Sequence, residues 1–235
     1  MKEAVLYLFP TPIADNDLNL SMPAINLELL EKCDCFIVEE LRTARRFLKK
    51  AGYRKDFEEV DFFVLNEHTK QEEIEDYLKP ILDNRNIGLM SEAGLPCVAD
   101  PGSMVVSLAQ RKGIRVKPLV GASSLMMALM SSGFNGQNFA FVGYLPVDKF
   151  LRVKRIKELE MLVSKYNQTQ IFIEAPYRNN QMMESLVNNL NPETLICVGV
   201  DISMDSEEII AKPAKAWKKT NIELNKRNTV FLIYK

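Results

Sequence analysis

Histidine is almost absent from this sequence, which holds a single one, His68, among 235 residues. Cysteine is also scarce, and two of the four are spaced C-x-C at 33–35, which matches no zinc knuckle or redox motif. A metal site built from cysteine and histidine is therefore not expected. The cysteines are predicted to be reduced, structural thiols, namely Cys33, Cys35, Cys97 and Cys197.

Long hydrophobic runs are missing as well. No apolar stretch reaches the length of a membrane span, and residues 1–10 are too short and too acidic for a signal peptide. These absences predict a cytoplasmic protein without a membrane partner. The sequence also lacks a G-x-G-x-x-G motif and a P-loop, which leaves little support for a dinucleotide or ATP site. The net charge of −1 does not favour nucleic acids overall, so an RNA surface would have to come from local clusters.

Short apolar runs that alternate with helix-like segments dominate the first half of the chain. Strands are expected at 4–9, 35–38, 62–65, 87–90 and 116–120. Helices are expected between them at 21–32, 43–51, 70–84 and 103–112. This β-α repetition predicts a mostly parallel sheet with helices on both faces.

The second half has fewer crossover helices. Strands are expected at 139–144, 170–174, 195–200 and 228–234, with helices at 122–132, 148–166 and 179–189. A mixed sheet follows from that order. The fold class is therefore α/β with two α/β domains, residues 1–117 and residues 118–235.

Three turns rich in glycine or proline each follow the carboxyl end of a strand, where open α/β sheets bind ligands. They are Pro-Thr-Pro-Ile at 10–13, the stretch at 91–102, and Gly-Ala-Ser-Ser at 121–124. The stretch at 91–102 contains two glycines, two prolines and two acids, so it cannot form a regular element. Glycine lets a backbone approach a ligand closely and proline fixes its path.

These turns, with Ile-Glu-Ala-Pro-Tyr-Arg at 173–178, occur in the order and at the intervals of a known family. They resemble the motifs of the ribosomal RNA (cytidine-2′-O)-methyltransferases, which belong to the tetrapyrrole methylase superfamily. The resemblance runs from about Tyr7 to the end of the chain.

The resemblance implies a homodimer that holds S-adenosylmethionine in a cleft between the two domains. By position, the residues expected to line the cofactor in the first domain are Pro10, Ser91, Glu92, Ala93, Gly94, Ala99, Asp100 and Gly102. Those expected from the second domain are Gly121, Ser123, Ser124, Phe172, Glu174, Ala175 and Pro176.

Catalytic candidates follow the second and third strands. Glu67 and His68 correspond to Glu-His in the family's His-Glu-His-Asn segment. Glu39 and Arg42 stand where the family carries Glu-Asp-Thr-Arg and are candidates on the substrate side. A ribose hydroxyl is a poor nucleophile, so a base near it would assist the transfer.

Three basic clusters are candidates for contacts with RNA phosphates. The first has helical spacing, which puts its members on one face of a helix: Arg42, Arg45, Arg46 and Lys49. The second comprises Lys149, Arg152, Lys154, Arg155 and Lys157. The third flanks the only tryptophan, Trp217, and comprises Lys212, Lys215, Lys218 and Lys219. The family resemblance implies small ribosomal subunit RNA as the partner.

The sequence also departs from the family pattern. An Arg-Glu-Leu-Thr-Lys segment of the family appears here as Val-Asp-Ile-Ser-Met at 200–204, so both basic residues are missing. Two alternatives to RNA methylation stay open. One is methylation of a tetrapyrrole, corrin or other small molecule, and the other is a paralogue that binds the cofactor without catalysis.

Overall fold

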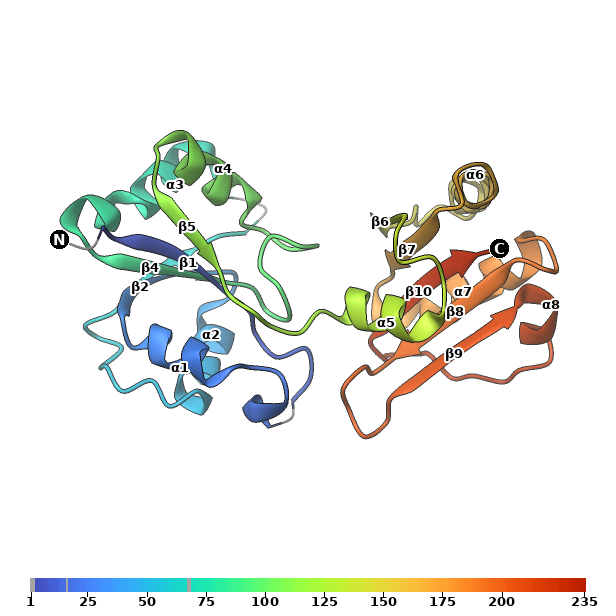
Figure 1. The fold of residues 1–235 in the computed structure, drawn as a ribbon, viewed down its shortest axis with the longest axis horizontal. Coiled ribbons are helices and arrows are strands. Elements are labelled where there is room, and N and C mark those ends of the chain that lie inside the picture. The colour runs from blue at the N-terminus through green and yellow to red at the C-terminus, as the bar shows by residue number, and fades with distance from the viewer. Residues whose placement is uncertain (1–2, 16, 67–68) are drawn as a thin grey trace. The chain divides into compact units, whose positions relative to one another are not determined.

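The computed structural model describes residues 3–15, 17–66 and 69–235, which form two compact units, Met1–Ser123 and Ser124–Lys235 (Figure 1). Each unit contains one five-stranded sheet. The division lies after the expected limit at 117, because the segment behind β5 is bonded to the first unit. Leu119 N–H donates to Leu8 O at 3.1 Å, and Asn26 Nδ2 donates to Val120 O at 2.8 Å.

The N-terminal domain has an all-parallel sheet in the order β3-β2-β4-β1-β5. Its strands are β1 (Val5–Phe9), β2 (Cys33–Val38), β3 (Asp61–Val64), β4 (Asn86–Met90) and β5 (Arg115–Pro118). The expectation of a mostly parallel sheet is confirmed. The three central strands are apolar throughout because both of their faces are buried.

Helices cover both faces of this sheet (Figure 1). They are α1 (Ala24–Leu30), α2 (Leu41–Lys50), α3 (Gln71–Tyr77) and α4 (Ser103–Arg111), with 3-10 helices at Leu18–Leu20 and Lys79–Asp83. One hydrophobic core contains side chains of α1 and α2, and a second contains side chains of α3 and α4. The domain is therefore three layers with the sheet in the middle.

Two of the expected helices are shorter than predicted. The helix expected at 70–84 is α-helical only to Tyr77 and continues as a 3-10 helix, because Pro80 lacks the N–H that an α-helix needs and its ring crowds the preceding turn. The helix expected from residue 21 begins at Ala24, with Pro23 as its N-cap residue.

The C-terminal domain has a mixed sheet in the order β6-β7-β10-β8-β9, and the prediction of a mixed sheet is confirmed. Only β6 and β7 are parallel. The strands are β6 (Phe139–Tyr144), β7 (Thr169–Ile173), β8 (Leu195–Val200), β9 (Glu208–Pro213) and β10 (Thr229–Tyr234). β9 was not predicted, because it is an edge strand with a charged residue at its start, a proline at its end and side chains that are at most partly buried.

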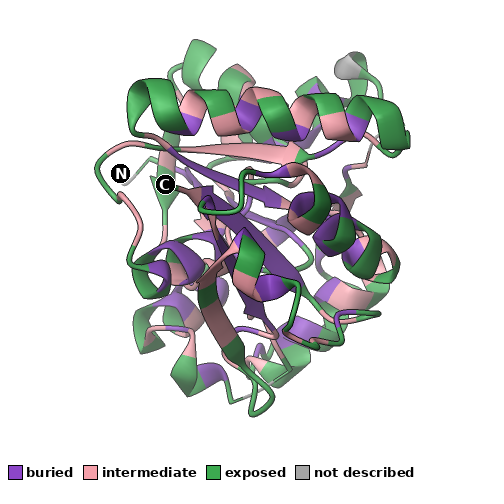
Figure 2. Cartoon of the chain, turned by 90° about the vertical axis from the view of Figure 1, so that its right-hand side faces the viewer, coloured by how far each residue is buried: buried purple, intermediate pink, exposed green. Residues whose placement is uncertain are grey.

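The helices of this domain are α5 (Ser124–Ser132), α6 (Lys149–Tyr166), α7 (Asn179–Asn189) and α8 (Ala214–Trp217), with a 3-10 helix at Pro176–Arg178. Figure 2 shows buried residues along the central strands and exposed residues on the outer helix faces. Asp148 caps α6 by accepting from Leu151 N–H at 2.8 Å, and Asn167 ends it in a left-handed conformation. No helix among the described residues is long and apolar enough to cross a membrane.

Candidate functional site

The first and second turns meet at the carboxyl edge of the parallel sheet, because β1 and β4 are neighbouring parallel strands. Thr11 and Gly94 exchange two backbone hydrogen bonds, at 2.9 and 3.0 Å. The buried Thr11 hydroxyl also donates to Ser91 O at 3.2 Å. These bonds join the turn at 10–13 to the stretch at 91–102.

The third turn is packed against the first. A Cβ atom placed on Gly121 would lie 2.1 Å from Pro10 Cβ, so no larger residue fits there without movement of the backbone. One placed on Gly94 would lie 3.3 Å from Ile13 Cγ2, and Gly94 has a positive φ of 79°. Glycine is required at both positions, which brings the backbones of all three turns together.

The stretch at 91–102 holds an irregular backbone. Cys97 and Ala99 have φ values of 69° and 65°, in the left-handed region that residues other than glycine seldom adopt, and Gly102 has a φ of 127°. Such conformations cost on the order of 1 kcal/mol or more each and are concentrated at ligand sites. The path of this stretch is therefore maintained by its surroundings and not by local preference.

Three carboxyl groups gather at this edge, and none of them makes an ion pair among the described residues: Glu39, Glu92 and Asp100. Burial raises the pKa of Glu39, and the negative charges of Asp100 and Glu92 raise it further. Burial also raises the pKa of Asp100, against the opposing effect of the Ser91 hydroxyl. Glu39 Oε2 is buried without a hydrogen-bond partner among the described residues.

The neighbouring acid, Glu40, has a different role. Its carboxylate accepts from the backbone N–H groups of Arg42 at 2.9 Å and Thr43 at 2.6 Å, which caps α2. These bonds lower the pKa of Glu40. Glu40 is thus a helix cap, and Glu39 is the acid that faces the strand ends with spare hydrogen-bonding capacity.

In the C-terminal domain, Glu174 and Ala175 directly follow β7. Glu174 is buried, and its Oε1 accepts from Arg178 Nη2 at 2.6 Å and from Ala175 N–H at 2.7 Å. The Phe172 side chain is fully buried and stacked on Phe231 with ring centroids 5.8 Å apart. The predicted ligand role of Phe172 is thereby restricted to its backbone atoms.

The remaining candidate site residues lie in several different elements. Arg42 is exposed in the first turn of α2, Ser123 ends the N-terminal unit and Ser124 begins α5. Glu67 and His68 lie outside the described residues. The segment at 200–204, which lacks the family's basic residues, begins with the last residue of β8 and continues into the turn before β9.

Sequence reasoning gave no site role to three side chains that shape the edge. Thr11 and Asn26 hold the turns through the bonds described above, and the Thr43 hydroxyl lowers the pKa of Glu92 and donates to Glu40 Oε2 at 2.9 Å. Thr11 lies inside a recognised motif and could have been found. Asn26 and Thr43 lie outside the motifs, and only the fold brings them to the edge.

The three basic clusters differ in how exposed their side chains are and in whether those side chains have partners. Arg42, Arg45, Arg46 and Lys49 are exposed on α2. In the second cluster, Arg152 is buried and donates to Ser185 Oγ at 3.1 Å, so its expected contact with phosphate is wrong.

Other members of the second and third clusters have acidic or structural partners. Arg155 pairs with Glu158 at 3.1 Å, and Lys215 pairs with Glu193 at 2.6 Å. Trp217 is buried, with its indole N–H bonded to Ile196 O at 3.0 Å. The α2 cluster is therefore the strongest of the three candidates for an RNA contact.

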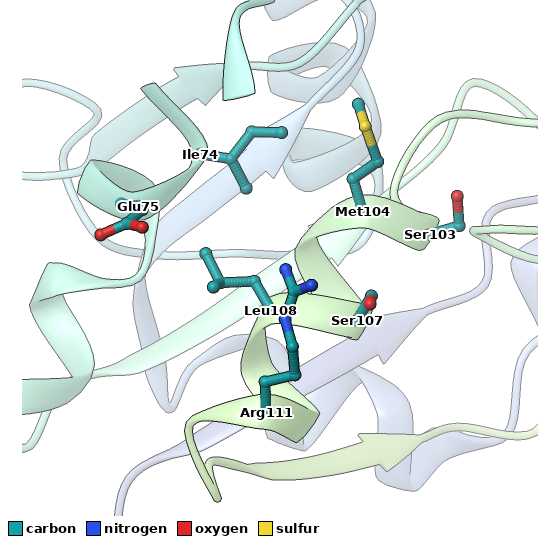
Figure 3. A pocket seen from close by; sticks show the side chains of 7 residues that line it. All are labelled: Ile74, Glu75, Ser103, Met104, Ser107, Leu108 and Arg111. Atoms are coloured by element: carbon teal, nitrogen blue, oxygen red, sulfur yellow. The ribbon is translucent and has the colours of Figure 1, made fainter. Parts of the chain in front are cut away.

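A pocket of about 390 Å³ lies between α3 and α4 (Figure 3). Its lining residues are Ile74, Glu75, Ser103, Met104, Ser107, Leu108 and Arg111. None of them was predicted to contact cofactor or substrate. Among the described residues, no group of three or more histidine, cysteine or acidic side chains could hold a metal ion. The four cysteines are free, and burial raises the pKa values of Cys33, Cys35 and Cys197 to about 12.

The comparisons with known proteins point to one family. Residues 18–217 match the family described as Tetrapyrrole (Corrin/Porphyrin) Methylases. A protein of Escherichia coli O157:H7 named Ribosomal RNA small subunit methyltransferase I is 29% identical over 231 residues, which cover 97% of this chain and 77% of that protein. A protein of the same name from Leptospira borgpetersenii is 33% identical, over 76% of this chain and 68% of its own length.

Solved structures agree with the fold. A crystal structure of the methyltransferase CobJ has a TM-score of 0.63 at 14% identity and covers 99% of this chain and 94% of its own. The cobalamin biosynthetic enzyme cobalt precorrin-4 methyltransferase, CbiF, has a TM-score of 0.59 at 15% identity, with 98% and 94% covered.

The carboxyl edge fits the cofactor of this family. S-adenosylmethionine carries a positive sulfonium and a positive amino group, and the edge offers three carboxyl groups without ion pairs among the described residues. Gly94 and Gly121 keep the three turns close together, because a side chain at either position would meet Ile13 or Pro10. The chain belongs to the tetrapyrrole (corrin/porphyrin) methylase family and is an S-adenosylmethionine-dependent methyltransferase.

Proposed function

We propose that this enzyme methylates the ribose 2′-hydroxyl of a cytidine in 16S ribosomal RNA. The observation that carries the proposal is the similarity, over 97% of the chain, to a protein named Ribosomal RNA small subunit methyltransferase I. The exposed basic face of α2, which begins directly after the carboxyl edge, supports an RNA substrate.

The cofactor is proposed to bind at the joined turns of the N-terminal domain. When bound, it supplies an electrophilic methyl group on a sulfonium. Pro10, Gly94 and Gly121 set the backbone against which it lies, and Glu92 and Asp100 offer negative charge to its cationic groups. The contribution of Glu174, Ala175 and Pro176 stays a prediction from the family resemblance.

Glu39 is the proposed base. Its pKa is raised by burial and by two neighbouring carboxyl groups, which makes its carboxylate a better proton acceptor than an exposed one. Its Oε2 atom is buried and has no partner among the described residues, so it can accept the proton of a hydroxyl. Glu67 and His68 remain candidates for the same role by resemblance.

The α2 face is proposed to contact RNA phosphates. The Arg45 guanidinium lies 5.2 Å from the centroid of the Phe62 ring and 5.7 Å from that of Phe57, and Lys49 Nζ lies 5.9 Å from the Phe57 centroid. These aromatic contacts restrain the two side chains while their charges stay exposed. Restrained cations lose less entropy when they bind phosphate.

The first test is methyl transfer from radiolabelled S-adenosylmethionine to small ribosomal subunits from a strain that lacks the gene. Wild-type protein should label the RNA at one cytidine ribose. Glu92→Ala should weaken cofactor binding, measured by calorimetry, and Glu39→Gln should lower kcat by about 100-fold while the cofactor still binds. Glu72→Ala, which changes an exposed acid on α3, is the matched control and should keep full activity. Cofactor binding without RNA labelling would reject the ribosomal substrate.

The basic face is tested by the salt dependence of RNA binding. Arg45→Ala and Lys49→Ala should each reduce the slope of log affinity against log salt concentration by about 1. Lys112→Ala, which changes an exposed lysine at the end of α4 on the other face of the sheet, should leave the slope unchanged. An unchanged slope in all three variants would reject α2 as the RNA contact.

A homodimer is proposed from the family resemblance, and a cytoplasmic location follows from a ribosomal substrate. Sedimentation equilibrium of the full chain should give a molecular mass of about twice that of the monomer. A monomer mass over the whole concentration range would reject the dimer.

A further inference from the structure

Two exposed tyrosines lie at one edge of the C-terminal sheet, outside the residues assigned to the cofactor. Tyr144 ends β6, and Tyr177 lies in the 3-10 helix that follows β7. β6 and β7 are parallel neighbours with Tyr144 opposite Ile173, so both tyrosines stand at the same end of the strand pair. Their exposed fractions are 60% and 65%, which is unusual for side chains with so much apolar surface.

A bulge in β6 turns Tyr144 outward. Val142 packs against the hydrophobic core, and regular alternation would point residue 144 to the same side. The register shifts between Phe141 and Tyr144, and Gly143 within the shift has a positive φ of 70°. As a result Tyr144 is exposed and Leu145 is buried. Bulges of this kind re-aim a side chain and are common next to functional sites.

An arginine is held beside the tyrosines. Arg178 donates to the buried Glu174 Oε1 through Nε at 3.0 Å and Nη2 at 2.6 Å. Its guanidinium carbon lies 5.1 Å from the centroid of the Tyr177 ring, and Nη1 lies 3.1 Å from the Tyr177 hydroxyl oxygen. The pKa of Arg178 is raised, first by its hydrogen bond to Glu174 and also by the nearby hydroxyl groups of Tyr177 and Tyr144 when they are ionised. Glu174 therefore acts as a positioning residue that fixes a planar cation among exposed rings.

We propose that Tyr144, Tyr177 and Arg178 bind an unstacked nucleobase of the RNA substrate. Aromatic rings and guanidinium planes stack on bases splayed out of a strand, and the positive charge favours the adjoining phosphate. This inference rests on the proposed function, because it specifies how that RNA is held. A flat tetrapyrrole could stack on the same rings, and the experiment separates the two ligands.

The test is fluorescence anisotropy of the full chain with a labelled single-stranded RNA oligonucleotide and with a blunt RNA duplex of the same length. Tyr144→Ala and Tyr177→Ala should each weaken binding of the single strand by about tenfold, with little effect on the duplex. The corresponding Phe variants, which keep the ring, should bind nearly as well as wild type. Tyr166→Ala is the matched control, because Tyr166 is also exposed and carries Lys165 over its ring but lies at the far end of α6.

Cofactor binding and methyl transfer are measured on the same proteins. If wild type methylates RNA and the alanine variants keep their single-strand affinity and KM, the nucleobase site is rejected while the proposed function stands. Equal losses for duplex and single strand would also reject base stacking, since only the backbone would then be contacted. If wild type neither binds nor methylates RNA, the proposed function and this site both fail. Saturable binding of a carboxylated porphyrin, lost in both alanine variants, would then identify a tetrapyrrole ligand.

Discussion

Acids that follow the carboxyl ends of strands are arranged differently in the two domains. At the carboxyl edge of the N-terminal sheet, Glu39, Glu92 and Asp100 stand near one another, and none makes an ion pair among the described residues. In the C-terminal domain, Glu174 is paired with Arg178 at 2.6 Å, and Asp201 is paired with Arg227 at 2.7 Å. All of these acids lie after the carboxyl ends of strands, but only those in the C-terminal domain have a cationic partner within the protein.

Acids without an ion pair are suited to binding a ligand, whereas acids in ion pairs stabilise the fold. Carboxyl groups with raised pKa values favour a proton or an external cation, as a methyltransferase with a cationic cofactor requires. Paired acids have already satisfied that demand within the fold, so they hold other side chains in place. Three changes test this difference: removing the partner of a paired acid in the C-terminal domain, displacing the joined turns of the N-terminal domain, and titrating the acids beside those turns.

The largest effect is expected from Arg178→Ala, which would leave Glu174 buried and unpaired. Its side chain is 1% exposed, so the free energy of unfolding should fall by about 3–5 kcal/mol in urea denaturation. Adding Glu174→Gln should restore much of this loss because the buried charge disappears. Lys215→Ala, which breaks an exposed pair with Glu193, should cost less than about 1 kcal/mol. Equal costs for the two single variants would contradict the conclusion that the buried Glu174 depends on its partner.

An intermediate effect is expected from Gly121→Ala, which inserts a methyl group 2.1 Å from Pro10 Cβ. Relief of this overlap should cost about 1–3 kcal/mol of stability and weaken cofactor binding, because the turns must separate. The control is Gly136→Ala, where an added Cβ meets nothing within 4 Å. Unchanged cofactor affinity in Gly121→Ala would show that the close approach of the turns is not needed for binding.

The smallest effect concerns pH. Because the folded state raises the pKa of Glu39, it binds that proton more tightly than the unfolded chain does. The contribution of protonated Glu39 to the free energy of unfolding is fully present below the ordinary pKa of a glutamate. It is lost as the pH rises through the raised pKa of Glu39 in the folded state. Between about pH 4 and pH 7, wild type should therefore lose more unfolding free energy than Glu39→Gln.

Glu40 provides the control of opposite sign. Its pKa is lowered by the backbone N–H groups of Arg42 and Thr43, so its contribution is present above the ordinary pKa and is lost as the pH falls. Glu40→Gln should remove that loss on acidification. Identical pH profiles for the two variants would contradict the assignment of one acid to the edge and the other to the cap.

Regular elements were predictable where local pattern and burial agree. The apolar runs that became β1, β2 and β4 could be identified because both faces of these strands are buried. β9 was missed because it is a half-buried edge strand that ends in Pro213. Pro80 was a visible signal, and its effect on the helix at 70–84 could have been predicted.

The sequence motifs predicted which turns form the candidate site, but not the role of each side chain in it. Glu39 and Glu40 are adjacent acids in the sequence, and only the fold shows that one caps α2 while the other stays unpaired among the described residues. Arg152 looked like part of a basic surface, but it is buried because Ser185 on α7 offers it a partner far away in the sequence. Such long-range pairings leave no local signature.

The place of β10 has a consequence for how the protein is made. This last strand of the chain lies between β7 and β8, at the centre of its sheet. All strands of the N-terminal sheet have been synthesised once Pro118 has been added, so that domain can fold while translation continues. The C-terminal sheet cannot join its two halves until residues 229–234 have left the ribosome. A nascent chain that stalls shortly before this strand would expose the unpaired edges of β7 and β8, which makes it prone to aggregation and to capture by chaperones.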